Sequence, residues 1–390
     1  MRLQAYTLTL ALALVLVGTT AQAGWDEGVA ALKAKNYDQA AKEFKTVVDQ
    51  QPEWAPGQRM LGQVLVKLGK TDDALTHLRK AYDLDPSDVA SQFALGQAYV
   101  EGRRYADGAS VLGKIDRSKL PPQQAGIIDN LLAVALSKSG QSDQALAALG
   151  RAAAGSPNDA KLQYQYGVAA LNAGDLSTAA KALDRSVRIK PDTENRKALV
   201  QVVMQQGRRA SGSSAKTEAY QRAASVASDL AKSDGSFDNL MMLAGAALGA
   251  KQYDVVIDAA SRASRAKSSD WLAYFYMGQA YTQKEQYTSA ETELRNALNN
   301  AKSNSDRSTI WGQLGFVFEK KKSYDDAISA YNQAGNSSAA ARVQQNKDTA
   351  NFNQDVEATN AEIQALREEQ EALQNELKSL PGAADPPSRF

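Results

Sequence analysis

Apolar and small side chains recur at three- and four-residue steps along most of the chain. Leu61, Leu65 and Leu68 form one such face, which predicts a helix followed by a short turn. The inner side of a second predicted helix, 73–84, carries Ala74, Leu75, Leu78 and Ala81. Two amphipathic helices joined by a short turn indicate an antiparallel pair, and one pair alone cannot bury its apolar face.

The pair repeats with a period of 34 residues, with small residues in register. The small-residue ladder runs through Gly28, Gly62 and Gly96, then Ala133 and Gly167 with Gln201 in place of the next small residue, then Ala244, Gly278 and Gly315. A second small residue follows most of these after twelve positions, as Ala74 follows Gly62. Small residues let two helix axes approach closely, so these positions predict the helix crossings. Prolines such as Pro86 and Pro191 close several repeats, because proline cannot continue a helix.

This spacing resembles the tetratricopeptide repeat family over residues 24–335, in nine units. The last two units match best, at Tyr274, Met277, Gly278, Tyr281, Ala290, Leu294 and Ala297, and at Trp311, Leu314, Gly315, Phe318, Ala327, Tyr331 and Ala334. The resemblance implies an all-α, right-handed α-solenoid of about nine helix-turn-helix units followed by a long C-terminal helix.

The sixth unit departs from the pattern. A polar stretch over 207–218 is predicted to be an inserted loop, locally basic through Arg208, Arg209 and Lys216. It separates units one to five with the start of unit six (24–206) from the end of unit six through unit nine (219–337). The sequence leaves open whether these parts form one superhelix or two blocks.

The family resemblance implies binding of a peptide or a partner helix by the first helices of the units. The groove positions carried over from the family are Arg59, Gln63, Phe93, Gln97, Asn130, Tyr164, Met241, Phe275, Tyr276 and Gln279. For each of them, ordinary packing between helices or a solvated face is the alternative. The carboxylate-binding residue set of cochaperone members is missing, so a chaperone C-terminus is not the expected ligand.

The C-terminal segment 338–380 changes to a seven-residue period and is predicted to be a coiled-coil helix, followed by a disordered tail over 381–390. Its seam consists of Phe352, Val356, Thr359, Ile363, Leu366, Gln370, Leu373, Leu377 and Leu380. This pattern suggests a homodimer or trimer, with Gln370 fixing the register. The alternative is a capping helix whose apolar stripe folds back on the last repeat.

The first residues have the pattern of a signal peptide over 1–23. Arg2 precedes an apolar run over 8–17, and Ala21 and Ala23 offer a cleavage site. A retained membrane anchor is the alternative, although the run is short for a span. We therefore expect an exported protein without a membrane span in its mature part, periplasmic in a cell with two membranes and secreted or wall-associated otherwise.

The amino-acid composition argues against several classes of function. The chain has 45 Lys and Arg against 44 Asp and Glu, no cysteine and one histidine, His77. The charge balance argues against a nucleic-acid binder, and the missing cysteines and scarce histidine argue against a metal site or cofactor and against catalysis. His77 is expected on the surface, and the acidic pairs 72–73 and 325–326 are expected at helix starts.

These observations favour a non-enzymatic exported scaffold that holds a protein partner in a cell-envelope complex. A glycan or peptidoglycan binder that uses Tyr274, Tyr276 and Trp311 is the first alternative. An enzyme of unrecognised type is the second. The sequence does not identify the partner, the envelope process or the organism.

Overall fold

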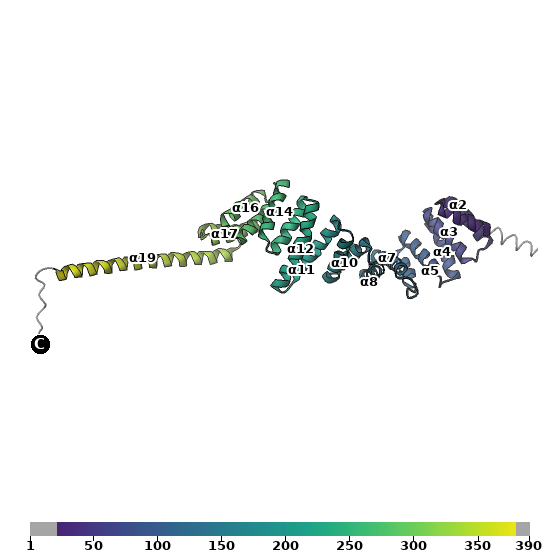
Figure 1. Ribbon diagram of the computed structural model, residues 1–390, viewed down its shortest axis with the longest axis horizontal. Coiled ribbons are helices and arrows are strands. Elements are labelled where there is room, and N and C mark those ends of the chain that lie inside the picture. The colour runs from purple at the N-terminus through teal and green to yellow at the C-terminus, as the bar shows by residue number, and fades with distance from the viewer. Residues whose placement is uncertain (1–21, 380–390) are drawn as a thin grey trace, which may run out of the picture. The chain divides into compact units, whose positions relative to one another are not determined.

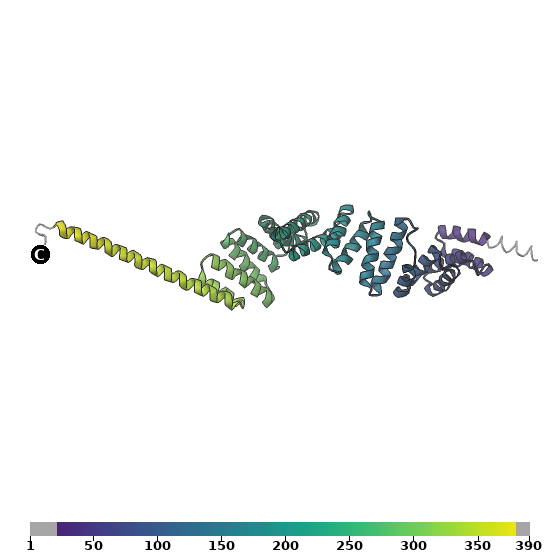
Figure 2. The same ribbon diagram turned by 90° about the horizontal axis from the view of Figure 1, so that it is seen from below.

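The computed structural model describes residues 22–379, with side chains as far as Leu377 (Figures 1 and 2). The chain forms two compact units, Met1–Gln206 and Gly207–Phe390. The expected signal peptide over 1–23 and the expected tail over 381–390 lie largely or wholly outside the described residues.

The first unit is built from successive helix pairs. Residues 22–33 are helical and pair with α2 (Tyr37–Gln50). The next pairs are α3 (Ala55–Lys67) with α4 (Thr71–Leu84), α5 (Val89–Glu101) with α6 (Tyr105–Gly113), α7 (Pro122–Lys138) with α8 (Ser142–Gly155), and α9 (Ala160–Asn172) with α10 (Leu176–Ile189). The following helix, α11 (Thr193–Arg209), contains the boundary between the two units.

The second unit continues the same arrangement. Its helices are α12 (Ser213–Ser233), α13 (Phe237–Gly249), α14 (Tyr253–Ala266), α15 (Trp271–Gln283), α16 (Tyr287–Asn300), α17 (Asn304–Lys320), α18 (Tyr324–Gln333) and α19 (Ser337–Ser379). Within the described residues there are thus nine helix pairs followed by one long helix, which confirms the predicted all-α solenoid architecture.

The small residues lie where the two helices of a pair cross, as predicted. A Cβ atom added to Gly62 of α3 would lie 2.5 Å from Cγ of Leu78 in α4. Gly278 of α15 meets Leu294 of α16 in the same way, at 2.6 Å. Leu78 and Leu294 are fully buried, so the glycine surface and the leucine side chain form the centre of each pair.

The predicted inserted loop over 207–218 is wrong. Helix α11 continues to Arg209 and α12 starts at Ser213, so the insertion mostly lengthens two helices. The residues at the start of α12, such as Ser, Ala and Lys, are compatible with a helix. The buried ring of Tyr220 in α12 packs against Gly207 and Gly249, which anchors the longer helix.

Helix α19 begins as part of the last repeat. Ala340 and Val343 are buried against the preceding helices, and Lys347 pairs with Asp325 of α18 at 2.5 Å. From Phe352 to Leu377 the apolar side chains are 40–67% exposed. The fold-back alternative is therefore wrong for this part of α19, which contributes no buried side chain to the repeats.

None of the described helices is both long and apolar enough to span a membrane.

Candidate functional site

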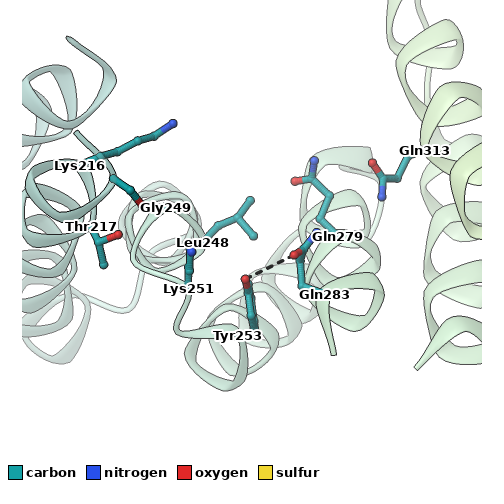
Figure 3. Close-up of a pocket in the computed structure, with 10 residues that line it drawn as sticks. Lys216, Thr217, Leu248, Gly249, Lys251, Tyr253, Gln279, Gln283 and Gln313 are labelled. Carbon is teal, nitrogen blue, oxygen red and sulfur yellow. Dashed lines mark hydrogen bonds between the residues drawn. The ribbon is translucent and has the colours of Figure 1, made fainter. Parts of the chain in front are cut away.

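A candidate site in the second unit is a hollow formed mainly by the start of α12, the end of α13, and α15 and α17 (Figure 3). We call it the amide groove, because three glutamines line it. Its residues are Ser213, Lys216, Thr217, Leu248, Gly249, Lys251, Tyr253, Gln279, Gln283 and Gln313. Its volume is about 400 Å³, which is enough to hold several side chains of a bound peptide segment.

The polar groups of the amide groove are only weakly engaged within the protein. The Tyr253 hydroxyl donates to Oε1 of Gln283 at 3.5 Å, and Nε2 of Gln313 donates to the Thr282 hydroxyl at 3.5 Å. Both distances lie beyond the usual range of a strong hydrogen bond. The Gln279 side chain has no hydrogen-bond partner among the described residues. These amides can therefore accept and donate hydrogen bonds to a ligand.

The amide groove carries positive charge at its edge. Lys216 at the start of α12 and Lys251 after α13 line it, and no acidic residue does. Neither lysine forms an ion pair with another described residue. Lys251 is held by a left-handed backbone turn, with φ of +60°, that ends α13. The groove thus favours a ligand with carboxylate groups.

A second hollow, of about 290 Å³, lies in the first unit between α7 and α9. It brings together Asn130 and Tyr164, two of the predicted groove residues, with the exposed Val134 beside them. Burial, followed by a hydrogen bond to Glu194, raises the pKa of the Tyr164 hydroxyl, so the hydroxyl stays protonated. This hollow is more apolar than the amide groove and follows the predicted first-helix surface.

Other predicted groove residues have partners within the protein. Arg59 pairs with Asp88 at 2.5 Å, and Gln97 donates to Glu101 at 2.8 Å. Burial would raise the pKa of Asp88, but hydrogen bonds from Ser91 and the charge of Arg59 outweigh it and lower that pKa. The Arg59 side chain is therefore held by Asp88, the N-cap residue of α5.

The remaining predicted groove residues divide between surface and core. Phe93 lines an apolar hollow of about 440 Å³, beside the exposed Ile127, and Gln63 is partly buried on α3. The prediction is wrong for Met241 and Phe275, which are only 9% and 8% exposed.

Of the neighbouring pair Tyr276 and Gln279, only Gln279 lines the amide groove. Tyr276 is partly buried, and this burial raises the pKa of its hydroxyl.

Sequence reasoning missed most of the amide groove. Gln313 occupies the position of Tyr276 one unit later, because 37 residues separate Gly278 from Gly315. That step could have identified Gln313. Lys216 lies within the inserted stretch 207–218 and Lys251 within the turn after α13, and the repeat pattern gives no signal for either position.

His77 is half-buried rather than on the surface as expected. The side chain of Gln58 donates to the carbonyl oxygen of Pro52 at 2.8 Å, which turns its oxygen toward His77. Nδ1 of His77 therefore donates to Oε1 of Gln58, at 2.7 Å. Burial is the main cause that lowers the pKa of His77. The acidic pairs 72–73 and 325–326 lie in the first turns of α4 and α18, as predicted.

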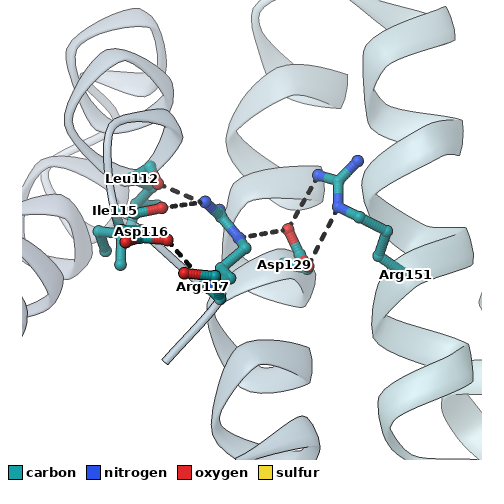
Figure 4. A network of polar contacts seen from close by, with 7 residues as sticks. Leu112, Ile115, Asp116, Arg117, Asp129 and Arg151 are labelled. Atoms are coloured by element: carbon teal, nitrogen blue, oxygen red, sulfur yellow. Dashed lines mark hydrogen bonds and ion pairs between the residues drawn. The ribbon is translucent and has the colours of Figure 1, made fainter. Parts of the chain in front are cut away.

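One buried charged cluster lies in the first unit (Figure 4). Asp129 of α7 accepts hydrogen bonds from Arg117 at 2.8 Å and from Arg151 of α8 at 2.9 and 3.2 Å. Arg117 also donates to the carbonyl oxygens of Leu112 and Ile115. Because these groups satisfy one another, the cluster joins helices and offers no open position for a ligand. Among the described residues, no three or more His, Cys, Asp or Glu are grouped to hold a metal ion.

Comparisons with known proteins agree with this architecture. A TPR repeat model matches residues 62–101, and a tetratricopeptide repeat model matches residues 130–193 and 277–341. Residues 62–101, 130–193 and 277–341 therefore match tetratricopeptide repeats. No protein of curated function matches the chain.

Several solved structures are similar over about half of the chain. MamA from Desulfovibrio magneticus RS-1 is 18% identical with a TM-score of 0.41, covering 44% of this chain and 96% of MamA. YrrB, described as a TPR protein with an unusual peptide-binding site, is 22% identical with a TM-score of 0.40, covering 48% and 93%. PilF of Pseudomonas aeruginosa is 15% identical with a TM-score of 0.43, covering 56% and 94%.

Proposed function

We propose that this protein is a non-enzymatic, exported scaffold that binds an extended segment of a partner protein in the amide groove and so serves a cell-envelope complex. The observation that carries the proposal is a hollow whose Gln279 amide and two lysines have no partner within the described residues. Polar groups of this kind lose little hydrogen-bonding energy when the polar groups of a ligand replace the water around them.

The lining chemistry suits an extended peptide. A glutamine side chain both donates and accepts hydrogen bonds, so Gln279, Gln283 and Gln313 can pair with backbone N–H and C=O groups. Leu248 provides apolar surface, and Lys216 and Lys251 attract carboxylates. A partner segment with alternating apolar and acidic residues fits this combination.

Export and the envelope role are supported by the N-terminal pattern. Arg2, the apolar run over 8–17 and the alanines at 21 and 23 are typical of a cleaved signal peptide. N-terminal sequencing of the protein recovered from its native cell tests this part of the proposal. A chain beginning at Gly24 supports cleavage and export, whereas a chain that retains Met1 contradicts it.

The groove is tested by crosslinking and affinity purification from the native envelope fraction. The test variant combines Lys216→Glu with Gln279→Ala, which reverses one edge charge and removes one free amide. The matched control is Lys302→Glu, because Lys302 is exposed and lies outside the groove. A stoichiometric protein that copurifies with the wild type and the control but not with the groove variant supports the proposal. A protein retained by all three chains contradicts groove binding.

Glycan binding, the alternative function, has weaker support. Tyr274, Tyr276 and Trp311 are partly buried side chains that pack against the core of the last repeats. Part of the surface of each ring is therefore already covered by protein atoms, whereas sugar binding by aromatic residues needs an open ring face. Cosedimentation of the protein with purified cell wall would support this alternative function.

A further inference from the structure

The exposed part of α19 has the seam of a two-stranded coiled coil. Counting from the structure, the a positions are Val356, Ile363, Gln370 and Leu377, and the described d positions are Phe352, Thr359, Leu366 and Leu373. β-Branched residues at a with leucine at d favour a parallel pair of helices over larger bundles.

The charged flanks of this seam distinguish the two orientations. The g positions are Asp355, Glu362, Glu369 and Glu376, all acidic, and the e positions are Asn353, Asn360, Arg367 and Gln374. In a parallel pair each g residue faces an e residue of the other helix. Glu362 then meets Arg367, Asp355 meets Asn360 and Glu369 meets Gln374, and the position that Glu376 would face lies outside the described residues. In an antiparallel pair, g faces g, so four acidic residues of one helix face those of the other.

Gln370 constrains the register. It is the polar residue among the a positions of the described seam, and any shift by one heptad places it against Ile363 or Leu377. In the unshifted parallel pair its amide meets the same amide of the other copy and can hydrogen-bond with it. A shifted pair leaves the amide unsatisfied in an apolar layer, which is the more costly arrangement.

We infer that the α19 segment from Phe352 onward pairs with the same segment of a second copy as a parallel, in-register, two-stranded coiled coil. The four heptads of this seam span about 40 Å at a rise of about 1.5 Å per residue. This association is independent of the amide groove, so either can fail without the other.

Single engineered cysteines test the orientation cleanly, because the chain contains no cysteine. Thr359→Cys and Leu373→Cys place thiols at d positions equally far from Leu366, the centre of the seam. In a parallel, in-register pair, each variant forms a disulfide-linked dimer by itself in a redox buffer. In an antiparallel pair, a positions face d positions and only a residue on the two-fold axis faces its own copy, so at most one of the two variants crosslinks by itself. The control is Ala361→Cys, which lies at an outer f position and should remain uncrosslinked.

Light scattering of the full chain provides the second measurement. The chain mass is 41.8 kDa, and the inference requires twice the mass of the chain under study. Leu366→Glu should reduce the mass to that of one chain without unfolding the repeats, since the Leu366 side chain is 58% exposed. A monomeric wild type, failure of either cysteine variant to crosslink by itself, or a trimeric mass would overturn the inference. So would a stoichiometric helix from a different protein crosslinked to Thr359→Cys in the native envelope fraction.

Discussion

Removing the buried carboxylate of Asp129 should destabilise the first unit more than breaking an exposed ion pair does. The Asp129 side chain is 3% exposed and accepts three hydrogen bonds from two arginines. Replacing it by alanine leaves Arg117, which is 18% exposed, without its counter-ion. Breaking a buried ion pair from one side costs about 3–5 kcal/mol.

The structure places the Asp129→Ala cost near the lower end of that range, at about 3 kcal/mol. Arg117 retains the carbonyl oxygens of Leu112 and Ile115 as partners, so its guanidinium is only partly orphaned. Arg151 is 52% exposed and can return to water. Arg151→Ala should therefore cost only about 1 kcal/mol, because Asp129 keeps Arg117.

The matched control is Asp258→Ala. Asp258 also pairs with an arginine, Arg262 at 3.4 Å, but both side chains are largely exposed. An exposed pair of this kind contributes about 0–1 kcal/mol. Comparing the two aspartate variants separates the effect of burial from the loss of an Asp–Arg pair.

Urea unfolding followed by circular dichroism gives the free energy of unfolding, and hydrogen exchange by mass spectrometry locates the change. Exchange should accelerate in α7 and α8 for Asp129→Ala and remain unchanged there for Asp258→Ala. The reasoning is refuted if Asp129→Ala costs no more than Asp258→Ala, or if the acceleration appears elsewhere in the chain.

Three further changes test other parts of the structure. Gly62→Ala should lower the free energy of unfolding by about 1 kcal/mol, because overpacking against Leu78 exceeds the gain in helix propensity. Gly113→Ala has no neighbour within 4 Å and should be neutral or stabilising. Equal urea midpoints for the two variants would contradict this expectation. His77 has a lowered pKa in the folded state, so its contribution to the free energy of unfolding is present above pH 6.5 and is lost as pH falls from 6.5 through the folded pKa. His77→Gln should therefore flatten the dependence of the free energy of unfolding on pH in that window. Asp270→Ala should cost about 1 kcal/mol and accelerate exchange at the start of α15, where Asp270 accepts from the Leu272 amide at 3.1 Å; unchanged exchange there would argue against this cap.

The sequence predicted the repeat but not the sixth unit. The 34-residue period depends on local contacts such as Gly62 with Leu78, which recur in every well-formed pair and so leave a visible pattern. The stretch 207–218 is polar and rich in Ser and Gly, which suggested a loop. Its helical state depends on Tyr220 packing against Gly207 and Gly249, residues up to 29 positions away. Sequence pattern does not report such a tertiary contact.

The groove was predicted only in part for a related reason. The repeat identifies the first helix of each pair, and three of its predicted positions, Asn130, Tyr164 and Gln279, line hollows. A small rotation of a helix decides whether a neighbouring position points outward or into the core. Met241 and Phe275 fall on the core side of that division, where large apolar side chains are most stable.

The proposed pairing of α19 also changes what the amide groove can do. Two copies joined in parallel present two amide grooves to one partner. When a partner has two suitable segments, binding of the first segment raises the effective concentration of the second at the other groove, without any new contact. Such linkage raises apparent affinity by about 10²–10⁴-fold when both sites can be engaged together. Leu366→Glu should therefore weaken binding of a bivalent ligand while leaving the affinity for a single-segment peptide unchanged. Equal losses for both ligands would show that Leu366 affects the groove itself, and no loss for either would show that the two grooves act separately.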